Sequence, residues 1–392
     1  MIAAALLARE ETTLENVPNI EDIHTLVELV GMLGARVDYS PSEHRVRILA
    51  RNLDNPVIPP ELAAKARATF LVVGPLVARL GRAMAPHPGG CAIGTRPVNV
   101  DIKGLGQMGA TIGVEGPYYS MRTPGRLHGE SMYLDYPSHT GTENLLMAAT
   151  LAQGRTVLTH ASAEPEVIAL ADLLTQMGAR IKGAGTSTIE VEGVDELHGV
   201  RYPILPDRIE AGTFAIAAAI SGGEVSLDPP GLPFMTPLTY KLREVGVEVH
   251  DEDGVYRVRA GEKLSATELQ TLPYPGFPTD LQACFSTLLT QAHGTSIVHE
   301  RVYDNRLQYA SELAKMGAKV EVRGQTATIE GPARLHGATV RALDLRAGAA
   351  LVLAALAAEG LTVVEDIRHL ERGYEDIVTK LAALGASIRR ED

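Results

Sequence analysis

The residues best suited to chemistry lie in a glycine-rich segment, HPGGCAIGTRPVNV, which spans residues 87–100. Proline and three glycines disfavour a helix here, so we expect an exposed loop. The loop carries Cys91, with Arg96 five residues further on. A nearby cation lowers the pKa of a thiol and makes it more reactive. A lone thiol is more commonly a small buried hydrophobe, and from the residues alone both interpretations of Cys91 stay open.

Several charged or polar residues stand beside glycine or proline at the expected ends of elements, where sites are usually built. They are Arg67, Asp207, Arg208, Asp280, Asn305, Arg306, Asp344, Arg346 and Arg372. Any one of them alone is best explained as a surface ion pair, which contributes little to stability. The second cysteine, Cys284, lies in the helical apolar pattern DLQACFSTLLTQA, and we predict that it is buried in a core.

An internal repeat determines where these residues lie. A phrase of the form apolar–Gly–small–x–apolar occurs six times, with its glycines 68–75 residues apart. The glycines are Gly34, Gly109, Gly178, Gly246, Gly317 and Gly385. Helical periodicity precedes the glycine and strand-like alternation follows it. The sequence therefore predicts six β-α-β-α-β-β units, in each of which the glycine ends a helix. Equivalent ends of such units point into a common space, so several arginines could converge there.

An alanine-rich helix that continues through glycine into a strand recurs in the repeat, in the segments 148–161, 218–229 and 354–367. Small side chains let helices approach closely, and helices that are apolar on all sides are interior. We therefore expect an α/β protein with its helices inside its sheets, divided into domains 1–206 and 207–392. The alternative is an open α/β array with helices outside. The chain begins within the first alanine-rich helix, 2–8, without the strand that should precede it.

Composition narrows the classes of function. The 392 residues include 36 Lys+Arg and 48 Asp+Glu, a net charge of −12, with 4% aromatic residues and no Trp. Such a chain is a poor binder of nucleic acid or anionic membranes. Two cysteines exclude a disulfide framework, and no apolar stretch reaches the ~18 residues of a membrane span. No basic region precedes 2–8, so we interpret the N-terminus as a helix rather than a signal peptide and expect a cytoplasmic protein.

An ordered set of motifs resembles the enolpyruvyl transferase family. The motifs are GPLVARLG (74–81), PGGCAIGTRPV (88–98), LPDRIEAGT (205–213), FPTDLQA (277–283), DNR (304–306), DLRAGAALVLA (344–354) and RGYEDI (372–377). The resemblance implies a two-domain inverse α/β barrel of six units, which agrees with the repeat. It also implies transfer of enolpyruvate from phosphoenolpyruvate to the 3′-hydroxyl of UDP-N-acetylglucosamine, with release of phosphate. The GGC loop is typical of the branch that uses the sugar nucleotide, not of the shikimate branch.

The resemblance further implies roles for individual residues. Cys91 would be the general acid and would add covalently to phosphoenolpyruvate. Asp280 would take the proton of the attacking hydroxyl, and Arg372 would be the third catalytic residue, one of the arginines that pair with the phosphate and carboxylate of phosphoenolpyruvate. The implied substrate-binding residues are Arg67, Arg96, Pro97, Val98, Asn99, Val100, Ser138, His139, Val302, Arg306, Asp344 and Arg346. No metal or cofactor is implied, because the arginines neutralise the developing charge. The active site would lie in the cleft between the domains.

Three features depart from the family. The family carries a Lys-Asn pair just before the first alanine-rich helix. This sequence begins after it, so we expect either an upstream start or a less active site. The family's Arg-Pro-Val-Asp-Leu is RPVNV at 96–100 here, with an amide in place of the carboxylate. The family's Ser-Val-Gly-Ala-Thr-Glu-Asn is SHTGTEN at 138–144, where His139 either meets a phosphate or is a bulky loop residue.

Two alternatives to the main interpretation stay open. Asn99 and Thr140 would suit enolpyruvyl transfer to another nucleotide sugar. The absence of the Lys-Asn pair would suit a non-catalytic paralogue that binds a UDP-sugar. Retention of Cys91, Asp280 and the arginines favours an active enzyme. We expect it to act as a monomer or weak homo-oligomer on small-molecule substrates.

Overall fold

Six helices end at a glycine in the left-handed region of backbone conformation, as the repeat predicts. They are α1 (Glu21–Met32), α4 (Asn99–Gln107), α6 (Pro165–Gln176), α8 (Thr236–Glu244), α10 (Tyr309–Lys315) and α12 (Ile377–Ala383). The six glycines have φ between +92° and +105°, which strains any residue that has a Cβ. In five units a strand begins two residues after the glycine. In the sixth unit, residues 386–391 form no strand, so the expectation of a hairpin there is wrong.

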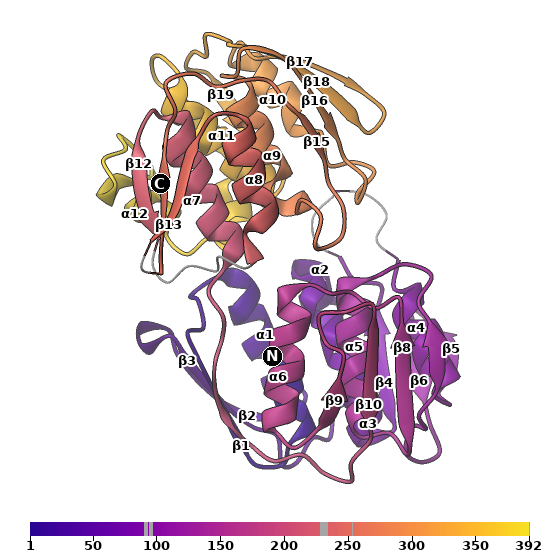
Figure 1. The fold of residues 1–392 in the computed structure, drawn as a ribbon. Coiled ribbons are helices and arrows are strands. Elements are labelled where there is room, and N and C mark those ends of the chain that lie inside the picture. Colours follow the sequence, from indigo (N-terminus) through magenta and orange to yellow (C-terminus); the bar gives the residue numbers. More distant parts are fainter. Residues whose placement is uncertain (90–92, 94–96, 228–233, 253, 392) are drawn as a thin grey trace. The chain divides into compact units, whose positions relative to one another are not determined.

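The structure, a computed structural model, describes residues 1–89, 93, 97–227, 234–252 and 254–391. It divides into two units, coloured from indigo to magenta and from magenta to yellow in Figure 1. The first unit contains the described parts of 1–90 and 97–205. The second contains the described parts of 91–96 and 206–392.

The first unit has three sheets, with strand orders β11-β1-β3-β2, β4-β6-β5 and β7-β8-β10-β9. Their strands are β1 (Glu11–Glu15), β2 (Arg36–Ser40), β3 (Arg45–Leu49), β4 (Arg82–Pro86), β5 (Thr111–Glu115), β6 (Tyr118–Arg122), β7 (Ser131–Tyr133), β8 (Arg155–Thr159), β9 (Arg180–Lys182), β10 (Thr188–Glu192) and β11 (Arg201–Pro203). In the first sheet β1 is antiparallel to β3 and parallel to β11, with Thr13 opposite Arg201. The first strand of this unit is therefore paired with its last.

The second unit repeats the plan with the sheets β12-β14-β13, β15-β16-β18-β17 and β19-β20. Their strands are β12 (Glu224–Leu227), β13 (Glu248–Glu252), β14 (Val255–Arg259), β15 (Glu268–Gln270), β16 (Gly294–His299), β17 (Lys319–Arg323), β18 (Thr326–Gly331), β19 (Thr339–Arg341) and β20 (Val363–Glu365). The last sheet has two strands because the sixth unit forms no hairpin.

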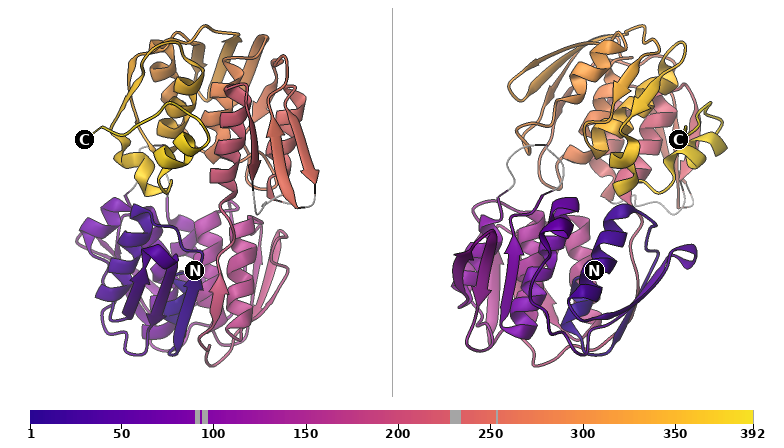
Figure 2. Two further views of the ribbon diagram at one scale, coloured as in Figure 1. Left: turned by 90° about the vertical axis from the view of Figure 1, so that its left-hand side faces the viewer. Right: turned by 180° about the vertical axis from the view of Figure 1, so that it is seen from behind.

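The interior of each unit is helical, so the inside-out arrangement is confirmed and the open array is wrong (Figure 2). The buried helices are η1 (Ala4–Leu7), α3 (Val73–Leu80) and α5 (His139–Thr150) in the first unit, and α7 (Arg208–Ile220), α9 (Thr279–Leu289) and α11 (Leu345–Ala357) in the second. The expected helix at 2–8 is the short 3₁₀ segment η1. Cys284 is fully buried in α9, as predicted. Among the described helices, none has the length and apolar character needed to cross a bilayer.

Glycine lets these inner helices touch. A Cβ added to Gly74 on α3 would lie 2.3 Å from the backbone oxygen of Asn144 on α5. One added to Gly348 on α11 would lie 2.3 Å from Leu370 in η5 (Ile367–Arg372). A Cβ at Gly74 would force α3 and α5 apart because it meets backbone, whereas one at Gly348 would displace the Leu370 side chain. The small residues noted in the sequence therefore determine how closely the inner helices pack.

Replacing Gly178 by alanine is expected to destabilise the first unit by about 1–2 kcal/mol, because an L-residue is strained at its φ of +105°. Crowding is not the cause, since the nearest atoms to an added Cβ lie 3.4 Å away on His198. Gly113→Ala is the matched control, because an added Cβ there meets nothing within 4 Å and the φ is not positive. Urea unfolding monitored by circular dichroism measures both. Equal midpoints for the two variants would contradict the proposed backbone strain.

Candidate active site

Three charged side chains meet at the start of two buried helices in the second unit. Asp280 is the second residue of α9 and Arg346 the second residue of α11. One carboxylate oxygen of Asp280 accepts hydrogen bonds from Nε and Nη2 of Arg346, at 3.2 and 2.9 Å. The other accepts one from Nη2 of Arg306, at 2.8 Å. The structure thus brings together three residues that the sequence places far apart.

The two arginines keep Asp280 ionised. Burial favours the neutral carboxyl, but the guanidiniums of Arg346 and Arg306 outweigh it and hold the pKa of Asp280 well below its usual range. Burial likewise disfavours the charged arginines, and Asp280 outweighs it to raise the pKa of both. These three side chains carry one net positive charge. They lie at helix N-termini, where backbone N–H groups also favour an anion.

Arg346 is held in place by its surroundings. Asp344 caps α11, its Oδ1 accepting the N–H groups of Arg346 at 2.8 Å and Ala347 at 3.0 Å. The guanidinium lies 5.3 Å from the centre of the Tyr374 ring, whose hydroxyl is hydrogen-bonded to Oγ1 of Thr213 at 2.9 Å. Nη1 of Arg346 is buried and makes no hydrogen bond of good geometry with any described residue. It is therefore a donor that an anionic ligand could use.

Other predicted residues of the second unit lie on adjoining elements. Val302 follows β16, and its N–H donates to Oε1 of the buried Glu300 at 2.8 Å. Arg372 ends η5, which packs against α11. Ile93 belongs to the second unit, and its carbonyl accepts the N–H of Asn305 at 3.2 Å.

Cys91 and Arg96 lie outside the residues that the structure describes. Their expected roles therefore remain predictions.

Glu300 was not anticipated from the sequence. It holds the turn that contains Val302, because its Oε1 also accepts the N–H of Tyr303 at 3.2 Å.

In the first unit, predicted binding residues gather around the start of α4. Nη2 of Arg67, which begins η3 (Arg67–Val72), donates to the carbonyl of Pro97 at 3.3 Å. Val98 is the N-cap of α4, and residues 99–100 are its first two. A small cavity here is lined by Arg67, Phe70, Leu71, Val98, Asp101, Thr140 and Asn144.

This cavity is also lined by a buried carboxylate, that of Asp101, which the sequence analysis missed. Oδ1 of Asp101 accepts a hydrogen bond from Nδ2 of Asn144 at 2.9 Å. Asn144 also donates to the carbonyl of Phe70 at 3.1 Å and accepts the N–H of Gly74 at 2.6 Å. Burial raises the pKa of Asp101. No local spacing signals this pair, because its members lie on different helices.

His139 and Ser138 stand at the start of α5. Oγ of Ser138 caps the helix by accepting the N–H of Gly141 at 3.1 Å. Nε2 of His139 lies 3.1 Å from Oε1 of Glu143, one turn further along. Burial disfavours the imidazolium, but Glu143 and then two further glutamates outweigh it and raise the pKa of His139 to about 9. His139 thus belongs to a helix and a carboxylate network, and the interpretation as a mere loop residue is wrong.

Comparisons with known proteins identify the family. The sequence model of the EPSP synthase (3-phosphoshikimate 1-carboxyvinyltransferase) family matches residues 1–381. UDP-N-acetylglucosamine 1-carboxyvinyltransferase 1 of Caldanaerobacter subterraneus subsp. tengcongensis is 46% identical, over 100% of this chain and 93% of the relative. UDP-N-acetylglucosamine 1-carboxyvinyltransferase of Finegoldia magna is 48% identical, over 100% and 92%. The chain belongs to the enolpyruvyl transferase family.

Solved structures agree with the fold of this enolpyruvyl transferase. The crystal structure of the enolpyruvyl transferase NikO from Streptomyces tendae matches it with a TM-score of 0.89 and 27% identity, over 99% of this chain and 92% of NikO. EPSP synthase from Acinetobacter baumannii, at 19% identity, shares the fold with a TM-score of 0.76. The resemblance and the fold class expected from the sequence are therefore confirmed.

Replacing Asp280 by asparagine in this enolpyruvyl transferase is expected to lower stability most at neutral pH. The pKa of Asp280 is lower in the folded than in the unfolded protein, so its ionised form stabilises the fold above the unfolded pKa of ~3.9. This contribution is lost as the pH falls toward the folded pKa. The difference in urea midpoint between wild type and Asp280→Asn should be clear at pH 7 and shrink below about pH 4.

The control for this experiment is Asp195→Asn. Asp195 pairs with Arg126, but its side chain is 94% exposed, so we expect little change at either pH. A midpoint difference for Asp280→Asn that stays constant from pH 7 to pH 3 would show that ionisation of Asp280 is not what stabilises the fold.

Proposed function

We propose that this chain transfers the enolpyruvyl group of phosphoenolpyruvate to the 3′-hydroxyl of UDP-N-acetylglucosamine and releases phosphate. The observation that carries the proposal is the Asp280 carboxylate held by Arg306 and Arg346 at the start of α9 and α11. The names of the relatives from Caldanaerobacter subterraneus and Finegoldia magna support the choice of acceptor.

The second unit binds the phosphate and carboxylate of phosphoenolpyruvate. Planar guanidinium groups pair bidentately with both kinds of anion. Arg346 supplies a buried Nη1 without a hydrogen bond of good geometry. Arg306 supports it through their shared carboxylate, Asp344 orients it, and Arg372 adds a further cation at the end of η5. Arg96 and Val302 complete the proposed set.

Asp280 is the base in this scheme. While it is paired with two guanidiniums its pKa is too low for it to take a proton from a sugar hydroxyl. An incoming phosphate shares those guanidiniums and adds negative charge, and both effects raise the pKa of the carboxyl. Asp280 thus becomes a competent base when phosphoenolpyruvate is bound, which couples proton removal to substrate binding.

The reaction proceeds by addition and elimination. The 3′-oxygen attacks C2 of phosphoenolpyruvate, its proton passes to Asp280, and the C3 methylene gains a proton from Cys91. The C2–O bond to phosphate then breaks and C3 loses a proton, which restores the double bond in the product. We propose that Cys91 can also add to C2 of phosphoenolpyruvate. The arginines balance the charge, so the scheme calls on no metal or cofactor.

The first unit binds the sugar nucleotide. We propose that Arg67, residues 97–100, Ser138 and His139 contact it, since they surround the starts of α4 and α5. The reaction would be a cytoplasmic step of peptidoglycan precursor synthesis. We propose a monomer or weak homo-oligomer, with no nucleic-acid or membrane partner.

Cys91→Ala is expected to lower turnover by a factor of about 10²–10⁴, because a positioned general acid contributes that much. Phosphate release from phosphoenolpyruvate and UDP-N-acetylglucosamine measures it. Cys91→Asp, which restores a proton donor, should recover part of the rate. The matched control is Cys284→Ala, since Cys284 is buried in α9 and burial raises the pKa of its thiol to about 12.

The same assay decides between the alternatives. If phosphate were released only in the presence of another nucleotide sugar, that compound would be the acceptor instead of UDP-N-acetylglucosamine. Binding of UDP-N-acetylglucosamine without any release would indicate a non-catalytic paralogue. Equal rates for Cys91→Ala and wild type would remove Cys91 from the chemistry.

Arg346→Lys is expected to lower kcat/KM by a factor of about 10²–10³, because lysine keeps the charge but cannot form two parallel hydrogen bonds. The control is Arg334→Lys, an arginine that pairs with Glu359 at 2.8 Å while 83% exposed. Steady-state kinetics with phosphoenolpyruvate as the varied substrate measures both. Equal values for the two variants would show that the planar group of Arg346 is not required.

A further inference from the structure

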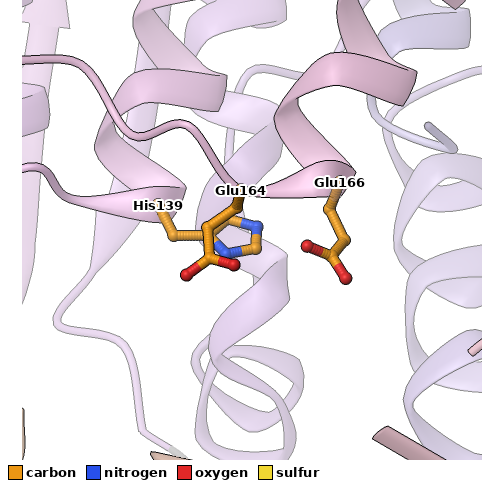
Figure 3. Close-up of side chains that lie close together, drawn as sticks. All are labelled: His139, Glu164 and Glu166. Atoms are coloured by element: carbon orange, nitrogen blue, oxygen red, sulfur yellow. The ribbon is translucent and has the colours of Figure 1, made fainter. Parts of the chain in front are cut away.

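We propose that His139, Glu164 and Glu166 form a binding site for a first-row divalent cation such as Zn²⁺ in the first unit (Figure 3). We call these three residues the His139 cluster. His139 is shared with the proposed sugar-nucleotide site, but the proposed enolpyruvyl chemistry uses no metal, so metal binding and phosphate release can be tested separately.

The backbone brings three suitable ligands together. His139 begins α5, while Glu164 is the N-cap of α6 and Glu166 lies in its first turn. One ligand atom from each side chain lies within 4.8 Å of the others. Ligand atoms in a tetrahedral zinc site are about 3.4 Å apart, given bonds of about 2.0–2.1 Å. Binding a cation would therefore require the two glutamate side chains to move closer to His139.

A fourth residue orients the histidine. Oε1 of Glu143 lies 3.1 Å from Nε2 of His139, and the Glu143 side chain is only 12% exposed. A carboxylate on one ring nitrogen fixes the imidazole and leaves the other nitrogen for a metal, an arrangement common behind metal-ligating histidines. Here that nitrogen is Nδ1. The cluster is therefore an oriented nitrogen donor with two carboxylates, not simply a group of acidic residues.

The charge of the His139 cluster favours a cation, although the cluster lies at the N-termini of two helices. Each N-terminus contributes a partial charge of about +0.5, which alone would attract an anion. Glu143, Glu164 and Glu166 contribute three negative charges, which outweigh both helices once the cation has displaced the proton that the raised pKa of His139 keeps on its ring. One imidazole nitrogen with carboxylate oxygens suits zinc and similar ions, whereas magnesium and calcium prefer oxygen ligands alone.

Metal binding to the full chain tests the proposal without substrates. Protein stripped with a chelator is dialysed against Zn²⁺, and the bound metal is measured by inductively coupled plasma mass spectrometry. We expect about one Zn²⁺ per chain. His139→Gln and Glu166→Gln should each weaken binding by at least about tenfold. Co²⁺ should give the visible absorption of a coordinated ion in the wild type and lose it in His139→Gln.

The matched control is His299→Gln. His299 pairs with Glu268 at 3.5 Å and is 25% exposed, so it tests the loss of a histidine from a different His–Glu pair. Thermal unfolding without metal confirms that each variant is folded. Absence of bound Zn²⁺ in the wild type, or equal affinity in wild type and His139→Gln, would overturn the proposal. Neither result bears on phosphate release, so the proposed reaction stands or falls separately.

Discussion

A guanidinium as deeply buried as that of Arg306 is stable only beside a carboxylate, because the energy lost on leaving water must be recovered locally. Its side chain is 4% exposed, and Asp280 is the partner. The same carboxylate also binds Arg346, so one anion ties together α9, α11 and the segment after β16. The charge that remains is positive and lies where helix dipoles reinforce it. The stability of the second unit and its proposed binding of an anion thus depend on the same three side chains.

That arrangement requires helices whose first turns can approach closely. Helices α9 and α11 are buried in the interior and pack against each other, and α11 is rich in alanine. A Cβ added to Gly348 in α11 would displace the Leu370 side chain. The inside-out packing is therefore the reason that residues at helix starts can meet. In an open array with helices outside, the sheet would separate them.

Local patterns in the sequence predict the parts of this fold that local physics determines. The six glycines end helices because only glycine adopts their backbone conformation without strain, and Cys284 is buried because it lies on an apolar helical face. The pairing of Asp280 with Arg346 spans 66 residues; the family resemblance assigned both residues to the site but did not indicate their pairing. Asp101 with Asn144 and the His139 cluster were missed, because each depends on how two separate helices are placed. The two-stranded last sheet was also missed, since the glycine phrase predicts a helix end but not the strand after it.

The pairing of β1 with β11 has a consequence for how the first unit is made. Residues 13–15 pair with residues 201–203, so a strand near the beginning of the unit has an unfilled edge until the end of the unit has been synthesised. At a translation rate of about 5–20 residues per second, that edge stays open on the ribosome for about ten seconds or longer. Exposed edges of this kind invite pairing with other chains. Glu11 and Glu15 at the ends of β1 place like charges on it, which discourages such pairing during the interval.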